Sequence, residues 1–332
     1  MPGADIQLRS IKGFHIGGTV REVSGFEPKS RSIVPGEPPE VVDMNGDHAL
    51  GQMYASYYQQ TNPQFSLPLL LWHGGGLTGV CWEDTPDGRP GWLDHFLRAG
   101  FDIVVSDAFE RGRASCPAYP QMLPEAPEYR SLNAIWHHFR LGPKGSYPGA
   151  HHGAAIREKA YPNQQFPVES LEQFAKQFVP RWTDTDQQAI QAYGRLLEKM
   201  GPSVIVGHSQ GAYYALVCAQ KYPELVRTVI AIEPPAVPSK IKISPDTSQN
   251  YLFLWGDYIH GVTNHWERYL LASKKYSEAL QSMGHGAEFI ELPDRGILGN
   301  SHMSIMDKNS DQIAELIRSW LMKRVHDIRC SR

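Results

Sequence analysis

The pentapeptide Gly207-His208-Ser209-Gln210-Gly211 has the Gly-x-Ser-x-Gly spacing in which a serine can act as a nucleophile. It follows an apolar run at 203–206, typical of a buried strand, and it opens a segment at 210–221 with the apolar spacing of a helix. A tight strand-to-helix turn exposes the serine hydroxyl, and glycines on both sides avoid Cβ clashes within that turn. We therefore predict that Ser209 is the nucleophile of an acyl-transfer reaction.

A serine hydroxyl needs a neighbouring base to accept its proton. His302 lies between a predicted strand at 288–292 and a predicted helix at 304–323, where the base is expected in the chain order serine, acid, histidine. The chain has 14 histidines, so placement alone selects His302. The doublets 137–138 and 151–152 lack a third ligand at metal-binding spacing, and we expect no metal and no cofactor.

Two carboxylates at strand ends are candidates for the acid that orients the histidine. Asp257 follows the later strand at 251–255, and its position favours it. Glu233 follows the apolar strand at 228–232, and two prolines stiffen the loop behind it. A carboxylate directly behind a fully apolar strand would be nearly buried and would need a partner, which favours Glu233. The residues alone leave the two candidates even.

The glycine-rich segment His73-Gly74-Gly75-Gly76 follows a predicted strand at 67–72. Loops of this kind supply a backbone N–H to the oxyanion of an acyl-transfer intermediate. We predict that the amides of Gly75 and Gln210 form the oxyanion hole. No Gly-Lys-Ser/Thr follows this loop, so the sequence disfavours a phosphate-binding loop.

The elements that must position these residues alternate as in a parallel sheet with crossover helices. The segments 5–22 and 40–60 predict an antiparallel pair, and further strands are predicted at 67–72, 101–106, 204–206, 228–232, 251–255 and 288–292. Almost a hundred residues between 106 and 204 lack a convincing strand. Because a loop of that length is improbable inside a domain, we predict a mainly helical cap. The predicted core comprises 1–110 and 201–332, and the cap comprises 111–200.

Aromatic residues in the cap and near the glycine-rich loop suggest a small to medium, apolar or aromatic ester as substrate. The candidate substrate-binding residues are His73, Gly76, Trp82, Trp136, Phe139 and Trp182. The aromatic rings among them could equally belong to the core. Arg111 and Arg113 either face a carboxylate on the substrate or brace a loop through ion pairs.

Composition restricts the partners of this 332-residue chain. Its formal net charge of −3 argues against a nucleic-acid-binding face. No apolar run approaches the length of a membrane span, and the first residues lack a secretory signal pattern. We expect a cytoplasmic protein, or a secreted one if a leader has been removed. The four cysteines form no zinc pattern, although a Cys81–Cys116 disulfide could join two neighbouring strand ends.

Several longer strings resemble a small bacterial-esterase branch of the α/β-hydrolase superfamily, and together they extend from about residue 10 to residue 321. The matching strings are His73-Gly74-x-x-Leu77-Thr78-Gly79, Trp82-Glu83-x-Thr85-Pro86-Asp87-Gly88-x-x-Gly91-Trp92, Arg111-Gly112-Arg113, Phe139-Arg140-x-Gly142-Pro143, Gln165-Phe166-Pro167-Val168, His208-Ser209-Gln210 and Gly299-Asn300-Ser301-His302-Met303.

The resemblance implies an α/β-hydrolase fold with a cap, serine carboxylester hydrolysis and a homodimer. It places the acid after the strand that follows the nucleophile, which favours Glu233 over Asp257. The chain departs from the family pattern at Gly75-Gly76, where the family has two cysteines, and at Gly211, where a relative has serine. Lactone opening or C–C bond hydrolysis by the same triad is the alternative function. A further alternative is that the protein is a non-catalytic, ligand-binding homologue.

Overall fold

The computed structural model describes residues 5–114, 122–149, 153–244, 247, 249–260 and 264–324. Its centre is an eight-stranded sheet in the order β1-β4-β6-β5-β7-β8-β9-β10. The strands are β1 (Leu8–Val23), β4 (Gly46–Gln60), β5 (Leu69–Trp72), β6 (Ile103–Asp107), β7 (Ser203–His208), β8 (Val226–Ile232), β9 (Asn250–Trp255) and β10 (Gly286–Glu291). Strand β4 pairs antiparallel with both β1 and β6, whereas the pairs from β6 to β10 are parallel. The predicted α/β-hydrolase fold is confirmed.

Helices cover both faces of the sheet because its central strands are apolar on both sides. In β5, Leu69 and Leu71 join one core cluster, and Leu70 and Trp72 join the other. The first cluster lies under α1 (Trp92–Arg98) and α8 (Ser310–Arg324), and the second lies under α5 (Asp186–Met200), α6 (Gln210–Lys221) and α7 (Asn264–Ser282). Helix α7 has no counterpart among the elements predicted from the sequence.

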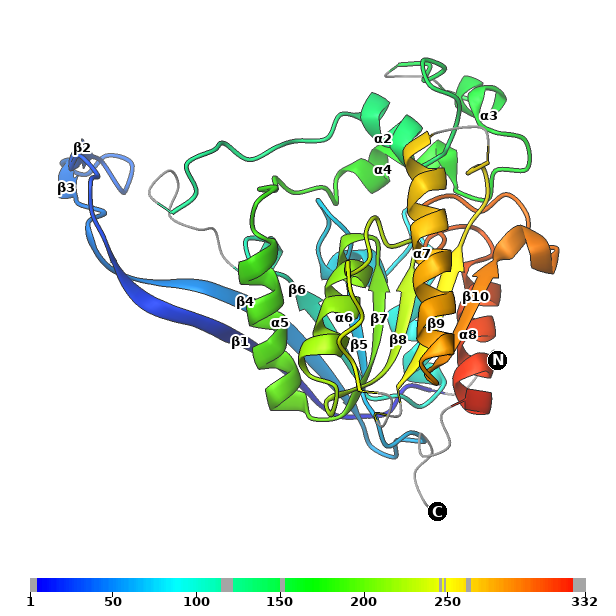
Figure 1. Ribbon diagram of the computed structural model, residues 1–332. Helices are drawn as coiled ribbons and strands as arrows, with labels where there is room; N and C mark the ends of the chain where they lie inside the picture. Colours follow the sequence, from blue (N-terminus) through cyan, green and yellow to red (C-terminus); the bar gives the residue numbers. More distant parts are fainter. Residues whose placement is uncertain are drawn as a thin grey trace.

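The N-terminal ribbon extends far beyond the body of the molecule (Figure 1). Strands β1 and β4 pair along almost their whole length, which confirms the predicted antiparallel pair. The short strands β2 (Lys29–Arg31) and β3 (Glu40–Val42) form a separate two-stranded sheet at the far end of the ribbon.

Short helices between β6 and β7 lie beyond the carboxyl ends of the parallel strands (Figure 1). They are α2 (Leu132–His138), α3 (Ala155–Lys159) and α4 (Leu171–Ala175), with 3₁₀ turns at Gly112–Ala114 and Val168–Ser170. Helix α5 falls within the predicted cap 111–200, yet it packs against β1, β4 and α6. This packing places α5 with the sheet, so we propose a cap that ends before it. Two further 3₁₀ turns lie at Gly79–Trp82 and Leu292–Arg295.

Two other expectations concern the chain as a whole. In the part that the structure describes, no helix combines the length and apolar character that a membrane crossing requires. Cys81 and Cys218 are buried. Cys116 lies outside the described residues, and so does the Cys81–Cys116 disulfide that the sequence left open beside free thiols.

Candidate active site

Ser209 lies in a sharp turn between β7 and α6, with φ 53° and ψ −120°. A positive φ is strained for a residue with a Cβ, and such strain often marks functional sites. The flanking glycines permit the turn: a Cβ on Gly207 would lie 2.6 Å from Ala212 Cα, and one on Gly211 would lie 2.4 Å from the Trp72 carbonyl oxygen. The Ser209 N–H also donates to the Ile232 carbonyl at 2.8 Å, which anchors the turn to the end of β8.

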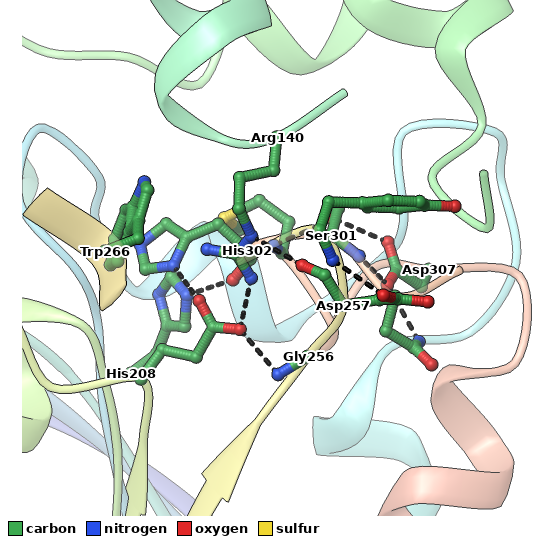
Figure 2. Close-up of polar contacts among 12 residues, drawn as sticks. Arg140, His208, Gly256, Asp257, Trp266, Ser301, His302 and Asp307 are labelled. Carbon is green, nitrogen blue, oxygen red and sulfur yellow. Dashed lines mark hydrogen bonds and ion pairs between the residues drawn. The ribbon is translucent and has the colours of Figure 1, made fainter. Parts of the chain in front are cut away.

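His302 is held by a carboxylate at the end of β8. Its Nδ1 lies 2.5 Å from Glu233 Oε2, and both side chains are buried. The His302 N–H donates to the Phe139 carbonyl at 3.0 Å. The Trp266 and His302 ring centroids are 4.3 Å apart. The imidazole therefore has a fixed position and orientation (Figure 2).

The carboxylate of Glu233 is fully buried and has three hydrogen-bond donors. Arg140 Nη2 donates to Oε1 at 2.5 Å and the Gly256 N–H donates at 2.7 Å, in addition to His302 (Figure 2). Burial would raise the pKa of Glu233, but the Arg140 charge and the bond to His302 outweigh it and lower the pKa to about 2. The carboxylate is thus ionised at neutral pH, and its buried charge is paired with Arg140.

The protonation of His302 follows from this pair. An ionised carboxylate only accepts hydrogen bonds, so Nδ1 of His302 carries the proton and Nε2 keeps a free lone pair. Burial lowers the pKa of His302 below its ordinary value, against the opposing effect of Glu233. The ring is therefore neutral at neutral pH and can accept a proton at Nε2.

Asp257, the other candidate acid, has a different set of contacts. Its Oδ1 accepts the Tyr258 N–H at 2.7 Å, and its Oδ2 accepts the Gly299 N–H at 2.8 Å. Arg140 Nε donates to the Asp257 carbonyl at 2.8 Å. The structure therefore brings Glu233 to the imidazole and uses Asp257 to brace the loop that carries His302.

A buried polar network fixes the other side of that loop. Asp307 accepts the Ser301 N–H at 2.8 Å, the Ser301 hydroxyl at 2.7 Å and the Asn300 amide at 2.9 Å (Figure 2). Burial raises the pKa of Asp307 to about 7, although these hydrogen bonds lower it. The network holds the residues immediately before His302.

The glycine-rich loop packs directly on the nucleophile. A Cβ on Gly74 would lie 3.1 Å from Ser209 Cβ, and one on Gly75 would lie 3.1 Å from the Gln210 side-chain oxygen. His73 is buried behind the loop: the Ala108 N–H donates to its Nε2 at 3.0 Å, and its Nδ1 bonds the Gly74 carbonyl at 2.8 Å. Burial, followed by the charge of Arg111, lowers the pKa of His73 to about 4, so the ring is a neutral brace.

A cavity of about 420 Å³ opens over these residues. Apart from the glycine-rich loop and the residues around Ser209 and His302, most of its lining comes from the cap and α7. It is lined by Gly74, Gly75, Leu77, Arg130, His138, Phe139, Arg181, His208, Ser209, Gln210, Pro235, His265, Trp266, Tyr269 and His302. The candidate nucleophile, the base and both predicted oxyanion residues therefore face one space.

The predicted substrate-binding residues divide into two groups. Phe139 lines the cavity, whereas Trp82 and Trp136 are fully buried in the core beneath it. Trp182 is buried and donates from its indole to the Glu125 carbonyl at 2.7 Å. His73 and Gly76 lie in the glycine-rich loop but outside the cavity lining. These five residues lie outside the lining of this cavity, and their part in substrate binding stays a prediction.

Several residues at the site escaped the sequence analysis. Arg140 belongs to a string that carries the family resemblance, but nothing in its spacing indicates contact with Glu233. Trp266 lies on the unpredicted helix α7. Arg130 and Arg181 lie in irregular segments of the cap, where no period identifies a common face. A positive φ at Arg140 (57°) and at Glu233 (47°) is likewise invisible in the sequence.

Comparison with known proteins finds similarity to esterases and to a lipase. A family model described as "Putative esterase" matches residues 145–285. "Probable secreted lipase phiG" of Fungal sp. (strain ATCC 74256) is 24% identical over 355 residues, covering 91% of this chain and 94% of the relative. The atomic-resolution structure of a novel bacterial esterase superposes with a TM-score of 0.81 at 29% identity, covering 97% of this chain and 98% of that one. The chain is thus a carboxylesterase-type hydrolase with the α/β-hydrolase fold.

Proposed function

We propose that the chain is a serine carboxylester hydrolase with Ser209 as nucleophile, His302 as base and Glu233 as the acid that orients it. The observation that carries this proposal is the buried Glu233–His302 pair, whose imidazole opens on the cavity that also holds Ser209. The ionised carboxylate keeps the proton on Nδ1, which leaves Nε2 free to act on the serine hydroxyl.

In the first half-reaction Ser209 Oγ attacks the ester carbonyl carbon while its proton passes to His302 Nε2. The Oγ–carbon bond forms, and the carbonyl electron pair moves to the oxygen. The intermediate then collapses, the alcohol leaves with the proton from Nε2, and an acyl-enzyme remains. Water attacks the acyl-enzyme by the same route and releases the acid. Glu233 stabilises the imidazolium that forms in both halves, and it stays ionised throughout.

The oxyanion of each intermediate needs donors that are already in place. The amides of Gly75 and Gln210 are the proposed donors, because both residues line the cavity beside Ser209. The side-chain amide of Gln210 donates to Asp186 Oδ1 at 3.2 Å and is thus engaged within the protein. Only the backbone of Gln210 is therefore assigned to catalysis.

The apolar part of the substrate is proposed to pack against Leu77, Phe139, Pro235, Trp266 and Tyr269, which line the same cavity. The volume of about 420 Å³ suits an ester of small to medium size. The name of the fungal relative, "Probable secreted lipase phiG", favours the secreted alternative for localisation. The predicted homodimer stays a prediction, which the molar mass in solution would test.

Pre-steady-state hydrolysis of p-nitrophenyl butyrate tests the proposal. We expect a burst of p-nitrophenol of about one equivalent when deacylation is slow, and intact-mass analysis should show one added butyryl group. Ser209→Ala should abolish both signals. Hydrolysis at an undiminished rate by Ser209→Ala, with the acyl group on another residue, would contradict the proposal.

A further inference from the structure

The cap side of the cavity carries two guanidinium groups, those of Arg130 and Arg181. Their segments are joined by a short antiparallel bridge, in which the Glu128 N–H donates to the Arg181 carbonyl at 2.7 Å and the Arg181 N–H donates back at 3.1 Å. The Val179 N–H donates to the Gly76 carbonyl at 3.0 Å. Backbone hydrogen bonds thus fix these segments against the glycine-rich loop.

Both side chains reach the loop itself. A Cβ on Gly75 would lie 2.5 Å from Arg181 Nη1, and a Cβ on Gly76 would lie 3.3 Å from Arg130 Nε. Since Gly75 is a proposed oxyanion donor, Arg181 lies beside the residue that would bind the reacting carbonyl, and Arg130 lies beside the next residue of the loop. A substrate group next to that carbonyl would therefore meet them.

The positive charge here is poorly matched within the protein. The Nε atoms of Arg130 and Arg181 are buried without a hydrogen-bond partner among the described residues. Glu128 is 66% exposed and lies 4.0 Å from Arg181 Nε, and no described residue lining the cavity is an aspartate or a glutamate. Burial, followed by the charge of Arg181, lowers the pKa of Arg130 to about 10, so the group is still charged at neutral pH.

Two other arginines near the sheet edge each have a close carboxylate, although the Nε of Arg111 is likewise buried without a hydrogen-bond partner among the described residues. Arg111 Nε lies 2.7 Å from Glu110 Oε1, and Arg113 Nε lies 2.8 Å from Asp107 Oδ2. From the sequence, Arg111 and Arg113 could either face a carboxylate on the substrate or brace a loop through ion pairs. The structure pairs both with carboxylates of the protein itself. Arginines that line a binding cavity and have no close carboxylate in the protein are suited to an anionic ligand.

We propose that the substrate is an ester that also carries a carboxylate, which Arg130 and Arg181 bind. This proposal rests on the serine-hydrolase function proposed above and replaces a purely apolar substrate with an amphipathic one. The planar guanidinium forks match a carboxylate geometrically. The apolar part of the ester packs against Trp266 and Tyr269, which line the same cavity.

Matched pairs of esters test this proposal. One pair places the carboxylate on the acyl side: p-nitrophenyl hydrogen glutarate and its neutral isostere, in which an isopropyl group replaces the carboxylate. The other pair places it on the alcohol side: 3-acetoxybenzoate and 3-isopropylphenyl acetate. We expect the wild type to prefer the anionic member of at least one pair by about tenfold or more in kcat/KM.

Arginine variants connect that preference to the cavity. Arg130→Gln and Arg181→Gln should each lower kcat/KM for the preferred anionic ester by about 10- to 100-fold, and for its neutral isostere by less than about threefold. Arg157→Gln removes an exposed cap arginine that pairs with Glu169, and it should change neither ester. Unchanged thermal unfolding temperatures would show that the variants fold.

Each contrary result has a distinct meaning. Equal losses on both members of a pair would assign the arginines to the oxyanion or to loop structure and would overturn the carboxylate proposal. Hydrolysis of the neutral esters by the wild type with no anionic preference in either pair would overturn it too, while leaving the serine-hydrolase function intact. Failure to hydrolyse all four esters would contradict the hydrolase function itself.

Discussion

The arginines on the two sides of the active-site cavity differ in whether their charge has a partner within the protein. Arg140 follows the cap helix α2 but points to the sheet side, where it is fully buried and donates to Glu233 and to the Asp257 carbonyl. On the cap side, Arg130 and Arg181 reach the glycine-rich loop with buried Nε atoms that have no hydrogen-bond partner among the described residues. A buried charge with its partner fixes geometry, whereas a charge without one favours an incoming anion.

This difference separates the two tasks of the site. The sheet side holds the imidazole in one tautomer and orientation before any substrate arrives, and positive φ values at Ser209, Glu233 and Arg140 show the backbone strain that accompanies this. The cap side offers charge and an apolar wall to the substrate. Changes on the sheet side should therefore reduce turnover of every ester, and changes on the cap side should alter selectivity.

The largest expected effect comes from the acid. Glu233→Gln should lower kcat by about 10³–10⁴, because an amide neither fixes the proton on Nδ1 nor stabilises the imidazolium. Asp257→Asn is the matched control, since Asp257 contacts the loop backbone and not the imidazole. We expect it to lower kcat by less than about tenfold, measured with p-nitrophenyl butyrate. The reverse order of the two effects would assign the acid to Asp257.

The next effect concerns the buried pair of Arg140 and Glu233. Arg140→Met should lower the free energy of unfolding by about 3–5 kcal/mol at neutral pH, because it leaves the Glu233 carboxylate buried with its charge unpaired. Urea denaturation measures this. Arg157→Met breaks an exposed pair and should cost less than about 1 kcal/mol. Equal costs for the two variants would mean that the buried pair has no special role.

The same pair predicts a pH dependence of stability. The folded-state pKa of Glu233 lies below its ordinary value, so its stabilising contribution is present above that ordinary value and is lost as the pH falls toward about 2. Arg140→Met should reduce this acid-side loss, as measured by unfolding free energies across the acid range. An unchanged profile would exclude Arg140 as the cause of the lowered pKa.

The pH dependence of activity is a smaller effect. Because the pKa of His302 is lowered from its ordinary value, kcat/KM should fall only below about pH 6.5 as Nε2 becomes protonated. Since Glu233 raises the pKa of His302 against burial, the residual activity of Glu233→Gln should show an acid limb at still lower pH. A limb that moves to higher pH would contradict the assignment of this pair.

The smallest effect should appear on the cap side. Raising the ionic strength from about 0.05 to 0.5 M should lower kcat/KM for the preferred carboxylate ester a few-fold, because salt screens partly exposed charges, and should leave its neutral isostere almost unchanged. Arg181→Gln should weaken this salt dependence. A salt effect of the same size on both esters would remove the distinction between the two sides of the cavity.

The sequence predicted the sheet side far better than the cap side, for a physical reason. Ser209, Glu233 and His302 each follow a strand, and parallel strands bring their carboxyl ends to one edge, so placement along the chain indicates proximity in space. The choice between Glu233 and Asp257 still needed the family resemblance. It depends on side-chain direction, which the strained backbone at Glu233 sets.

Residues of the cap, and of the other loops and helices around the cavity, lack such a rule. Trp82 and Trp136 have the composition of a binding surface, but they fill the core, whereas Trp266 reaches the cavity from a helix that the sequence analysis did not predict. Arg130 and Arg181 lie on irregular segments that are joined by a backbone bridge between Glu128 and Arg181. Contacts of this kind depend on tertiary packing, which has no local period in the sequence.

Labelling with a small neutral fluorophosphonate tests the central claim most directly, because it needs no knowledge of the natural substrate. The account predicts that one probe molecule attaches to the wild type and maps to the peptide containing Ser209. It also predicts slower labelling of Glu233→Gln than of Asp257→Asn, and none of Ser209→Ala. Labelling that persists in Ser209→Ala, or that maps to another serine in the wild type, would contradict the account.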